Sequence, residues 1–532
     1  MRFLNNIPKP LRYALIGLFW LLVWQLISFA VNNDVLLCSP IAVLVTLAKD
    51  SITLDFWGTI LFTFSRIALG FLFAFVAGIG FGALGWKFKT FATLFTPAIL
   101  AMKSVPVVCF AVLLLIWFGS SFACAFAVFL VVFPAIYGSV SEGLSHQDKN
   151  LAEMLHVFRV PTSRKLLTFY WPAIQPFLTA ACRVAVGMSW KSGVAAELIG
   201  IPFGSIGEKI YLSKILLSSA DLFSWTIVII IIALLCEKGF LELLKASGNW
   251  AWNAALPKTL IKIPFRRQGP ARLGERVPRS AGSAIIIKNL SKAFGGNRVI
   301  NNFSATFDVR ERYAISAASG TGKTTLFRLI AGLMTPDFGV IRRPERISMV
   351  FQEARLFENR SSLDNMRLIA GDYLDEHEIH SLLLRVLPPE SFDLPVSQLS
   401  GGMRRRLELC RALAVPSDVL LLDEPFAGLD AANRELAYDL IDANSNDCTV
   451  IITTHDLRDA DALGAQIIAL MPVVPEPDEF TLDEFSVDGF ATGEFAIDGF
   501  SVDEFSVDGF ATGGFAPIEL TPEELASYGN DW

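Results

Sequence analysis

The chain has 532 residues, of which 53% are hydrophobic and 18% are charged, and its formal net charge is −7. This composition excludes a single soluble body, because the apolar excess lies before residue 250 and implies that this half lies in a membrane. From residue 472 onward there are fifteen acidic residues and no Lys or Arg, so the rest of the chain is net basic, which suits an anionic inner leaflet.

Six segments of the first half approach the roughly 20 apolar residues that a transmembrane helix needs. The third is interrupted by Pro97, Lys103 and Pro106, which favours a broken helix or a re-entrant pair. Basic residues fall in alternate loops, and these loops are cytoplasmic by the positive-inside rule. We therefore expect an all-α polytopic membrane domain over residues 1–247, with about six helices at 11–31, 57–85, 92–119, 122–140, 173–199 and 216–236.

Five ionisable residues lie at or near membrane depth in these segments, where an isolated charge costs on the order of 3 kcal/mol. They are Arg66, Lys103, Arg183, Lys191 and Glu197. Because four of the five are basic, one interpretation is a translocation path that favours anions. The other is that they snorkel or pair structurally, and the sequence leaves both open.

In the loop between the fourth and fifth segments, a short amphipathic helix begins at Leu151-Ala152-Glu153-Met154. Pro172 ends this loop where the chain enters the membrane again. It resembles the EAA loop of binding-protein-dependent importers, through which a permease contacts its ATPase. Glu153 and Pro172 match that pattern, whereas Arg159 occupies the place of its glycine. Stretches around 65–72, 105–119 and 195–198 resemble permeases of the nitrate, sulfonate and taurine uptake group.

Residues 248–283 are rich in Pro, Gly and Arg, and we expect a solvated basic linker near anionic lipid headgroups. Nucleic-acid binding is the alternative for such a stretch. No aromatic residues are interleaved on a domain face, so we expect no nucleic-acid partner.

A phosphate-binding loop follows an apolar segment, and a helical pattern follows the loop. Backbone N–H groups of a small-residue turn and the start of a helix bind phosphates, while Lys323 reaches the β- and γ-phosphates and the Thr324 hydroxyl binds Mg²⁺. Ala317 departs from the motif, which has glycine at its first position. The residues expected to bind ATP here are Ser319, Gly320, Thr321, Gly322, Lys323, Thr324 and Thr325.

Three further motifs follow in order: Leu399-Ser400-Gly401-Gly402-Met403, a strand pattern that ends in Asp423 and Glu424, and a strand pattern that ends before His455. Asp423 at a strand end can hold Mg²⁺ through water, and Glu424 can polarise the water that attacks the γ-phosphate. Adjacent carboxylates on a strand point to opposite faces, which fits two separate roles.

In this order and spacing the motifs resemble the ATP-binding-cassette (ABC) ATPases, which implies an α/β P-loop domain over 284–471. The resemblance implies that Phe294 stacks on adenine, that Gln352 contacts Mg²⁺ or the attacking water, and that His455 contacts the γ-phosphate. It also implies that Ser400, Gly401 and Gly402 close over the ATP of a second chain, with Asp430 at the dimer contact. The catalytic set is then Glu424, His455, Gln352 and Lys323, and the Mg²⁺ set is Thr324, Gln352 and Asp423.

The last segment, residues 472–532, is acidic and repetitive. Phe recurs every five residues from Phe480 to Phe515, a period that matches neither a helix nor a strand, so we expect a disordered tail.

Together these features predict an ATP-driven importer in the bacterial cytoplasmic membrane, with its ATPase domain, linker and tail in the cytoplasm. The expected partners are a second copy of the chain, membrane lipid, an external substrate-binding protein and a small, anionic solute. An exporter is one alternative, disfavoured by the short membrane half. A membrane regulator that binds ATP and hydrolyses it poorly is the other, supported by Ala317 and Arg159.

Overall fold

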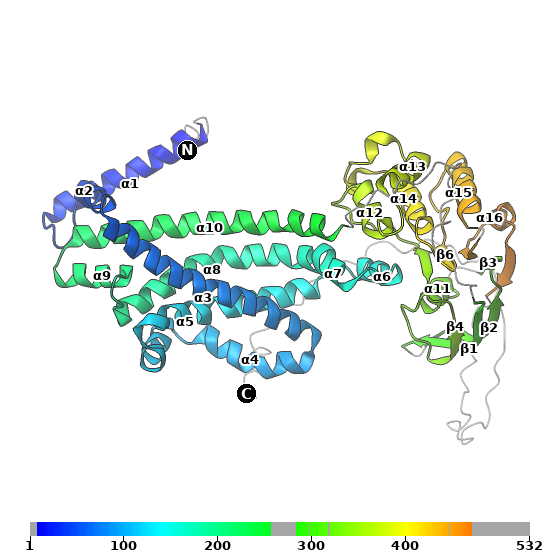
Figure 1. Cartoon of the computed structure of the whole chain (residues 1–532), viewed down its shortest axis with the longest axis horizontal. Coiled ribbons are helices and arrows are strands. Elements are labelled where there is room, and N and C mark those ends of the chain that lie inside the picture. Colours follow the sequence, from blue (N-terminus) through cyan, green and yellow to red (C-terminus); the bar gives the residue numbers. More distant parts are fainter. Residues whose placement is uncertain (1–7, 257–282, 296, 318–319, 446, 471–532) are drawn as a thin grey trace, which may run out of the picture. The chain divides into compact units, whose positions relative to one another are not determined.

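The computed structural model describes residues 8–256, 283–295, 297–317, 320–445 and 447–470, and it contains a helical part and an α/β part (Figure 1). The predicted tail, 472–532, lies outside the described residues, as do residues 257–282 of the predicted linker.

The helical part contains long helices joined by shorter ones. Its elements are α1 (Lys9–Val31), α2 (Pro40–Ser51), α3 (Leu54–Lys87), α4 (Lys89–Ser104), α5 (Val107–Ser145), α6 (Lys149–Val157), α7 (Thr162–Lys165), the π-helix η2 (Leu166–Tyr170), α8 (Trp171–Gly200), α9 (Ile206–Ile215) and α10 (Ser219–Ala255). Helix α10 extends to Ala255, past the predicted end of the membrane domain at residue 247.

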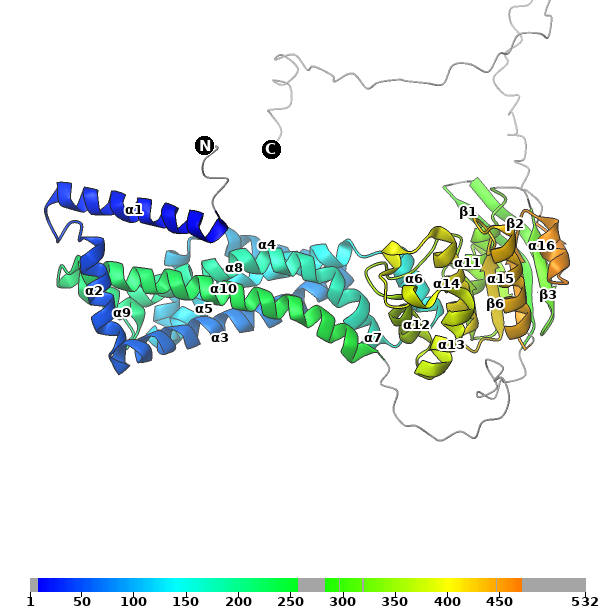
Figure 2. The same cartoon turned by 90° about the horizontal axis from the view of Figure 1, so that it is seen from above.

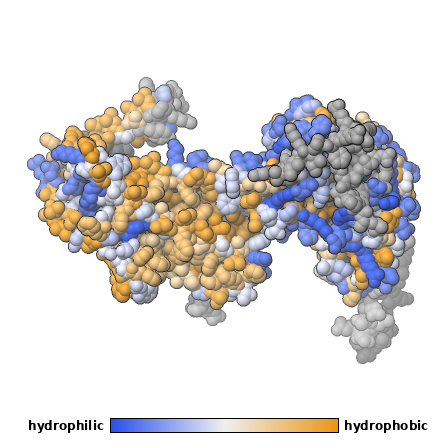
Figure 3. Space-filling view, in the orientation of Figure 1, coloured by the Kyte–Doolittle hydropathy of each residue, from blue (hydrophilic) through white to orange (hydrophobic). Residues whose placement is uncertain are grey.

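By length and composition, three helical segments within the described residues can cross a membrane: Ala14–Val31, α3 and α5. The six predicted crossings are therefore not confirmed. Figure 3 shows a largely hydrophobic surface over the helical part and a more hydrophilic one over the α/β part. Large apolar side chains such as Leu69, Phe73 and Leu113 are exposed on the helical part, as expected for a surface in contact with lipid.

The prediction of one span at 92–119 and another at 122–140 was wrong in its boundaries. Helix α4 ends at Ser104, Val105 is extended, and α5 then begins after Pro106 and runs through both predicted segments. Proline disfavours helical geometry in the residue before it, which explains the break at Val105. The expected loop near residue 120 is instead a kink inside α5, where Gly119 has φ 70° and ψ 176°.

Helices α3, α5, α8 and α10 run side by side, as Figure 2 shows. Helix α3 approaches α5 closely through the glycines Gly78 and Gly82. A Cβ added at Gly78 would lie 2.7 Å from the Ile136 side chain, and one at Gly82 would lie 2.8 Å from Val140. Small residues thus allow the two helices to pack closely.

The α/β part contains two sheets. Strands β1 (Ile285–Phe294), β2 (Asn297–Phe307) and β4 (Phe338–Arg342) form an antiparallel sheet in the order β2-β1-β4. Five parallel strands form the second sheet in the order β5-β6-β7-β3-β8: β5 (Ile347–Val350), β6 (Val419–Asp423), β7 (Thr449–Thr453), β3 (Arg312–Ser316) and β8 (Gln466–Ala469). Strands β5, β6 and β7 are buried along their whole length, as is usual for strands of a parallel sheet.

The helices of the α/β part are α11 (Lys323–Ala331), α12 (Ser362–Ala370), α13 (Glu376–Val386), α14 (Gly401–Leu413), α15 (Ala431–Asn444) and α16 (Leu457–Ala462). Helices α12, α13 and α14 share a hydrophobic core of their own.

Strands β3, β6 and β7 are neighbours in the parallel sheet, so their carboxyl ends meet at one edge. The phosphate-binding loop follows β3, Asp423 ends β6, and His455 comes two residues after β7. The topology therefore brings three separate sequence motifs together, at the edge where ligands bind in open α/β sheets.

Candidate functional site

The loop between β3 and α11 depends on glycine. Gly320 has φ 82° and Gly322 has φ 94°, which L-residues rarely adopt. A Cβ at Gly322 would also lie 2.8 Å from Cγ1 of Val299, so the position excludes larger residues on two grounds. Ser319, a predicted ATP ligand, lies outside the described residues, whereas Thr324 and Thr325 lie in the first turn of α11.

Ala317, the departure from the motif, fits its position without positive φ. In the described part of this loop, positive φ is confined to Gly320 and Gly322. The Ala317 carbonyl accepts a hydrogen bond from Nζ of Lys323 at 2.7 Å, and its methyl group packs against the core. The backbone at residue 317 therefore does not require glycine.

Lys323, Glu424 and His455 form one polar cluster. Nε2 of His455 lies 3.2 Å from Nζ of Lys323 and 3.0 Å from Oε1 of Glu424. Burial lowers the pKa of Lys323, an effect that the carboxylates of Glu424 and Asp423 partly oppose. The structure thus brings together three of the four predicted catalytic residues around one point of the sheet edge.

Asp423 presents a buried oxygen that suits a cation. Oδ1 accepts a hydrogen bond from Oγ1 of Thr453 at 2.7 Å, while Oδ2 is buried and has no hydrogen-bond partner in the described structure. Burial raises the pKa of this carboxyl, so a neighbouring cation would favour its ionised form. Oγ1 of Thr324 and Oε1 of Gln352 lie 3.5 Å apart. This set supplies the oxygen ligands that Mg²⁺ prefers.

The backbone of Glu424 is held in a strained conformation, with φ 48°. Its N–H donates to the Thr453 hydroxyl at 3.0 Å, and its carbonyl accepts a hydrogen bond from Nη2 of Arg405 at 2.6 Å. Non-glycine residues in left-handed geometry cluster at functional sites, where surrounding contacts hold them.

Sequence reasoning missed a buried ionic group on α14. Arg405 also donates to the carbonyls of Asp423 and Pro425, and its guanidinium pairs with Glu408 at 3.3 Å. Glu408 in turn pairs with Arg411 at 3.5 Å. Arg405, Glu408 and Arg411 are spaced three residues apart, which places them on one face of the helix and was the available signal. A helix with many charged residues is, however, more often interpreted as solvent-exposed. The group ties α14 to the end of β6.

Ser400, Gly401 and Gly402, the signature residues expected to close over the ATP of a second chain, lie at the start of α14. Ser400 caps the helix by accepting a hydrogen bond from the Met403 N–H at 3.3 Å. A Cβ at Gly401 would meet nothing within 4 Å, and one at Gly402 would only reach Leu429 at 3.7 Å. Packing within this chain therefore does not require either glycine.

Two further predicted residues lie apart from the Lys323 cluster. Asp430 caps α15 by accepting a hydrogen bond from the Asn433 N–H at 2.8 Å. Phe294, at the end of β1, is 43% exposed, and Nζ of Lys292 lies 5.6 Å from its ring centroid. An exposed ring at this place remains available for stacking on a base.

Helix α6 of the helical part contacts the α/β part. Glu153 pairs with Arg328 of α11 and with Arg355, whose Nη1 lies 2.7 Å from Oε2 of Glu153. Met154 and Leu155 are fully buried in the core of the α/β part. The α11 helix that contacts Glu153 begins at Lys323, so one element touches both Glu153 and the phosphate-binding loop. Pro172 lies in the first turn of α8.

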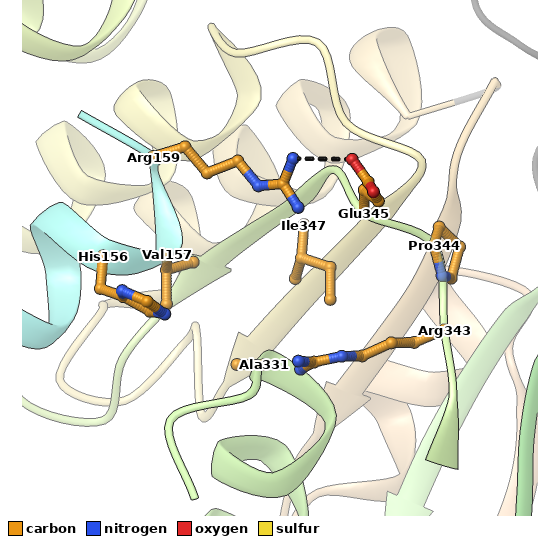
Figure 4. Close-up of a pocket in the computed structure, with 8 residues that line it drawn as sticks. All are labelled: His156, Val157, Arg159, Ala331, Arg343, Pro344, Glu345 and Ile347. Atoms are coloured by element: carbon orange, nitrogen blue, oxygen red, sulfur yellow. Dashed lines mark hydrogen bonds and ion pairs between the residues drawn. The ribbon is translucent and has the colours of Figure 1, made fainter. Parts of the chain in front are cut away.

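Arg159 follows α6 and has φ 51°, the conformation for which glycine is favoured. Its guanidinium pairs with Glu345 at 3.1 Å, and both side chains line a pocket of about 180 Å³. Figure 4 shows this pair on one side of the pocket, with Arg343 extending towards Ala331 on the other. The sequence difference at residue 159 therefore adds an ion pair at the junction.

We expect Arg159→Gly to change the free energy of unfolding by no more than about 1 kcal/mol. Relief of left-handed geometry, about 1–2 kcal/mol, is offset by the extra entropy of glycine in the unfolded chain and by loss of an exposed ion pair. Thermal unfolding of the purified chain measures the change, and Glu345→Gln isolates the ion pair. A loss above about 3 kcal/mol would show that Arg159 holds the junction together.

The end of α10 makes a second contact with the ATPase domain, at a place that the sequence assigned to the linker. The Trp252 side chain is 1% exposed, and its ring centroid lies 5.2 Å from that of Phe357. The Arg360 guanidinium lies 4.4 Å from the Trp252 ring centroid. A bulky aromatic residue fourteen residues before the first arginines of the linker was too weak a signal for sequence reasoning.

Comparisons with known proteins agree with this architecture. Residues 70–236 match the family model of the binding-protein-dependent transport system inner membrane component, and residues 300–427 match that of the ABC transporter.

The chain is 34% identical over 218 residues to the aliphatic sulfonates import ATP-binding protein SsuB 1 of Rhizobium johnstonii, covering 38% of this chain and 79% of that relative. It is 35% identical over 209 residues to the sulfate/thiosulfate import ATP-binding protein CysA of Pseudomonas syringae pv. tomato, covering 35% of this chain and 64% of that relative. It is 37% identical over 204 residues to the sulfate/thiosulfate import ATP-binding protein CysA of Mesostigma viride, covering 35% of this chain and 58% of that relative. The chain thus spans somewhat less than two thirds of the sulfate relatives.

The fold and the site define a membrane permease domain joined to a nucleotide-binding P-loop domain. The chain belongs to the ABC transporter family, and it combines the permease domain and the ABC-type ATPase domain in one polypeptide.

Proposed function

We propose that this protein is an ATP-driven importer of a small anionic solute, working as a homodimer in the bacterial cytoplasmic membrane with its ATPase domain in the cytoplasm. The observation that carries the proposal is the ion pair between Glu153 and Arg328, because it links the permease to the helix that begins at Lys323. A change at the nucleotide can thereby reach the membrane helices through one rigid element.

In the proposed reaction Lys323 binds the β- and γ-phosphates and His455 contacts the γ-phosphate. Glu424 orients the attacking water and accepts its proton, in a position fixed by Thr453 and Arg405. Asp423, Thr324 and Gln352 would hold Mg²⁺, which neutralises developing phosphate charge when bound. Phe294 would stack on adenine.

The proposed homodimer explains why space is left beside Gly401 at the start of α14. Among the described residues, nothing fills the position that a Cβ at Gly401 would take. Glycine there allows the backbone of α14 to approach the phosphates of ATP held by a second copy, and the helix start favours their negative charge. Ser400 and Gly402 would complete this contact, with Asp430 beside it.

The proposed solute class rests on two observations. Relatives of the ATPase domain are named as sulfate/thiosulfate and aliphatic sulfonates import proteins, and the residues predicted at membrane depth are mostly basic. The permease match to binding-protein-dependent systems favours delivery by a separate external binding protein.

Steady-state ATP hydrolysis by the full chain in lipid nanodiscs tests the proposal, with sulfate-, taurine- and nitrate-binding proteins added in turn. We expect basal hydrolysis of ATP, and an increase of severalfold with one loaded binding protein. Retained ATP binding without hydrolysis would favour the regulator alternative, and Ala317→Gly would then show whether residue 317 is the cause.

A further inference from the structure

Four of the five ionisable residues expected at membrane depth separate into two groups in the structure. The fifth, Lys103, is exposed in the last turn of α4. Arg66 and Glu197 pair at 3.2 Å, and Thr63 donates to the same carboxylate at 2.9 Å. Arg66 also donates to the carbonyl of Ser120, next to the α5 kink. This pair is buried and internally neutralised, so the structure assigns it a structural role.

Arg183 and Lys191 on α8 form the second group. Both side chains are exposed, and neither has an ion-pair or hydrogen-bond partner among the described residues. They lie eight residues apart, which is about 12 Å along a helix and slightly more than two turns. Both therefore project from one side of α8, together with Gly187 and the exposed Val184 and Met188. We call these five residues the α8 face.

The opposite side of α8 fixes the depth of these cations. Cys182, Val186 and Trp190 are buried in one core cluster with Ile67 of α3 and Val128 of α5. Helices α3 and α5 are two of the segments able to cross a membrane, and these residues lie well inside them. Arg183 and Lys191 therefore lie at the level of apolar segments.

A lipid environment does not suit the α8 face. Each cation facing hydrocarbon costs on the order of 3 kcal/mol, and such residues usually face a water-filled cavity or a counter-charge. Two copies placed with these faces together would bring four cations close to each other. Their mutual repulsion is relieved when an anion lies between them.

We propose that Arg183 and Lys191 line the translocation path between two copies of the chain and select the solute by its negative charge. The planar guanidinium of Arg183 can bind two oxygens of an oxyanion, while Lys191 acts as a point charge further along the path. The chemical class is a small oxyanion such as a sulfate or a sulfonate. This inference rests on the proposed importer and names the residues that recognise its solute.

Accessibility of introduced cysteines tests the inference without requiring transport. Arg183→Cys and Lys191→Cys, made separately in the full chain with Cys109→Ser, are treated in nanodiscs with an anionic and a cationic methanethiosulfonate reagent. Each reagent forms a mixed disulfide with the cysteine thiolate and releases a sulfinate. Leu72→Cys, on an exposed apolar part of α3, is the matched control for a lipid-facing position.

We expect both α8 cysteines to react at least tenfold faster than the Leu72 variant, and the anionic reagent to react at least fivefold faster than the cationic one. Adding Lys191→Gln to the Arg183→Cys variant should reduce this charge preference. Reaction as slow as the control with both reagents would overturn the proposal, because the face would then meet lipid. Equal rates for the two reagents would overturn the charge selection. Basal ATP hydrolysis, measured on the same samples, reports separately on the proposed function.

Discussion

Replacement of Glu424 by Gln is expected to lower ATP turnover at least about 100-fold while leaving ATP bound, since a positioned general base contributes about 10²–10⁴ in rate. Gln keeps the size of the side chain and its contact with His455, which lies 3.0 Å away in the native site. It removes the negative charge that accepts a proton from water. The strained backbone at residue 424 is held by contacts of main-chain atoms, so it does not depend on the carboxylate.

The measurement is phosphate release by the full chain in nanodiscs, beside binding of labelled ATP to the same samples. Glu435→Gln is the matched control, because Glu435 is exposed on α15 and lies outside the site. Turnover of the Glu424 variant within threefold of the native protein would contradict the assignment and move the role of base to another group.

Glu153→Gln is expected to disconnect the permease from the ATPase. The substitution removes the charge that pairs with Arg328 and Arg355, and the Arg355 side chain is only 10% exposed. Hydrogen bonds to charged groups contribute about 1.5–3 kcal/mol each, so the docking of α6 should weaken by at least that amount. Basal hydrolysis should persist, because the Lys323, Glu424 and His455 cluster is unchanged. Stimulation by a loaded binding protein should be lost.

Amide hydrogen exchange over α6 tests the same substitution directly, and we expect exchange there to become at least tenfold faster. Glu142→Gln serves as the control, since Glu142 lies on α5 and pairs with His146 at an exposed position. Unchanged protection of α6 together with normal stimulation would show that Met154 and Leu155 alone hold the helix in place.

Motifs read from the sequence predicted most of the residues that the structure brings together around Lys323. Glycines with positive φ, strand ends with carboxylates and a histidine after a buried strand are local patterns, and the parallel sheet brings them to one edge. Their catalytic and binding roles remain predictions, but their positions around Lys323 are those that the chemistry requires.

Features that depend on contacts between distant segments were not predictable. The kink at Gly119 lies inside a continuous apolar run, where hydropathy does not distinguish a loop from a bent helix. Nothing in the sequence singled out Arg405, which lies in the interior and donates a hydrogen bond to the carbonyl at the end of β6. In both cases the deciding partner is far away in the sequence.

Trp252 and Glu153 both hold the permease domain against the ATPase domain of the same chain. Glu153 docks the short helix α6 onto the ATPase domain and Trp252 docks the end of α10, both by non-covalent contacts. What a covalent connection adds is a high effective concentration and a fixed ratio of one ATPase to one permease. The sulfonate and sulfate relatives are named as ATP-binding proteins alone. By this effective concentration, joining the two parts favours pairing of this ATPase domain with the permease domain of its own chain.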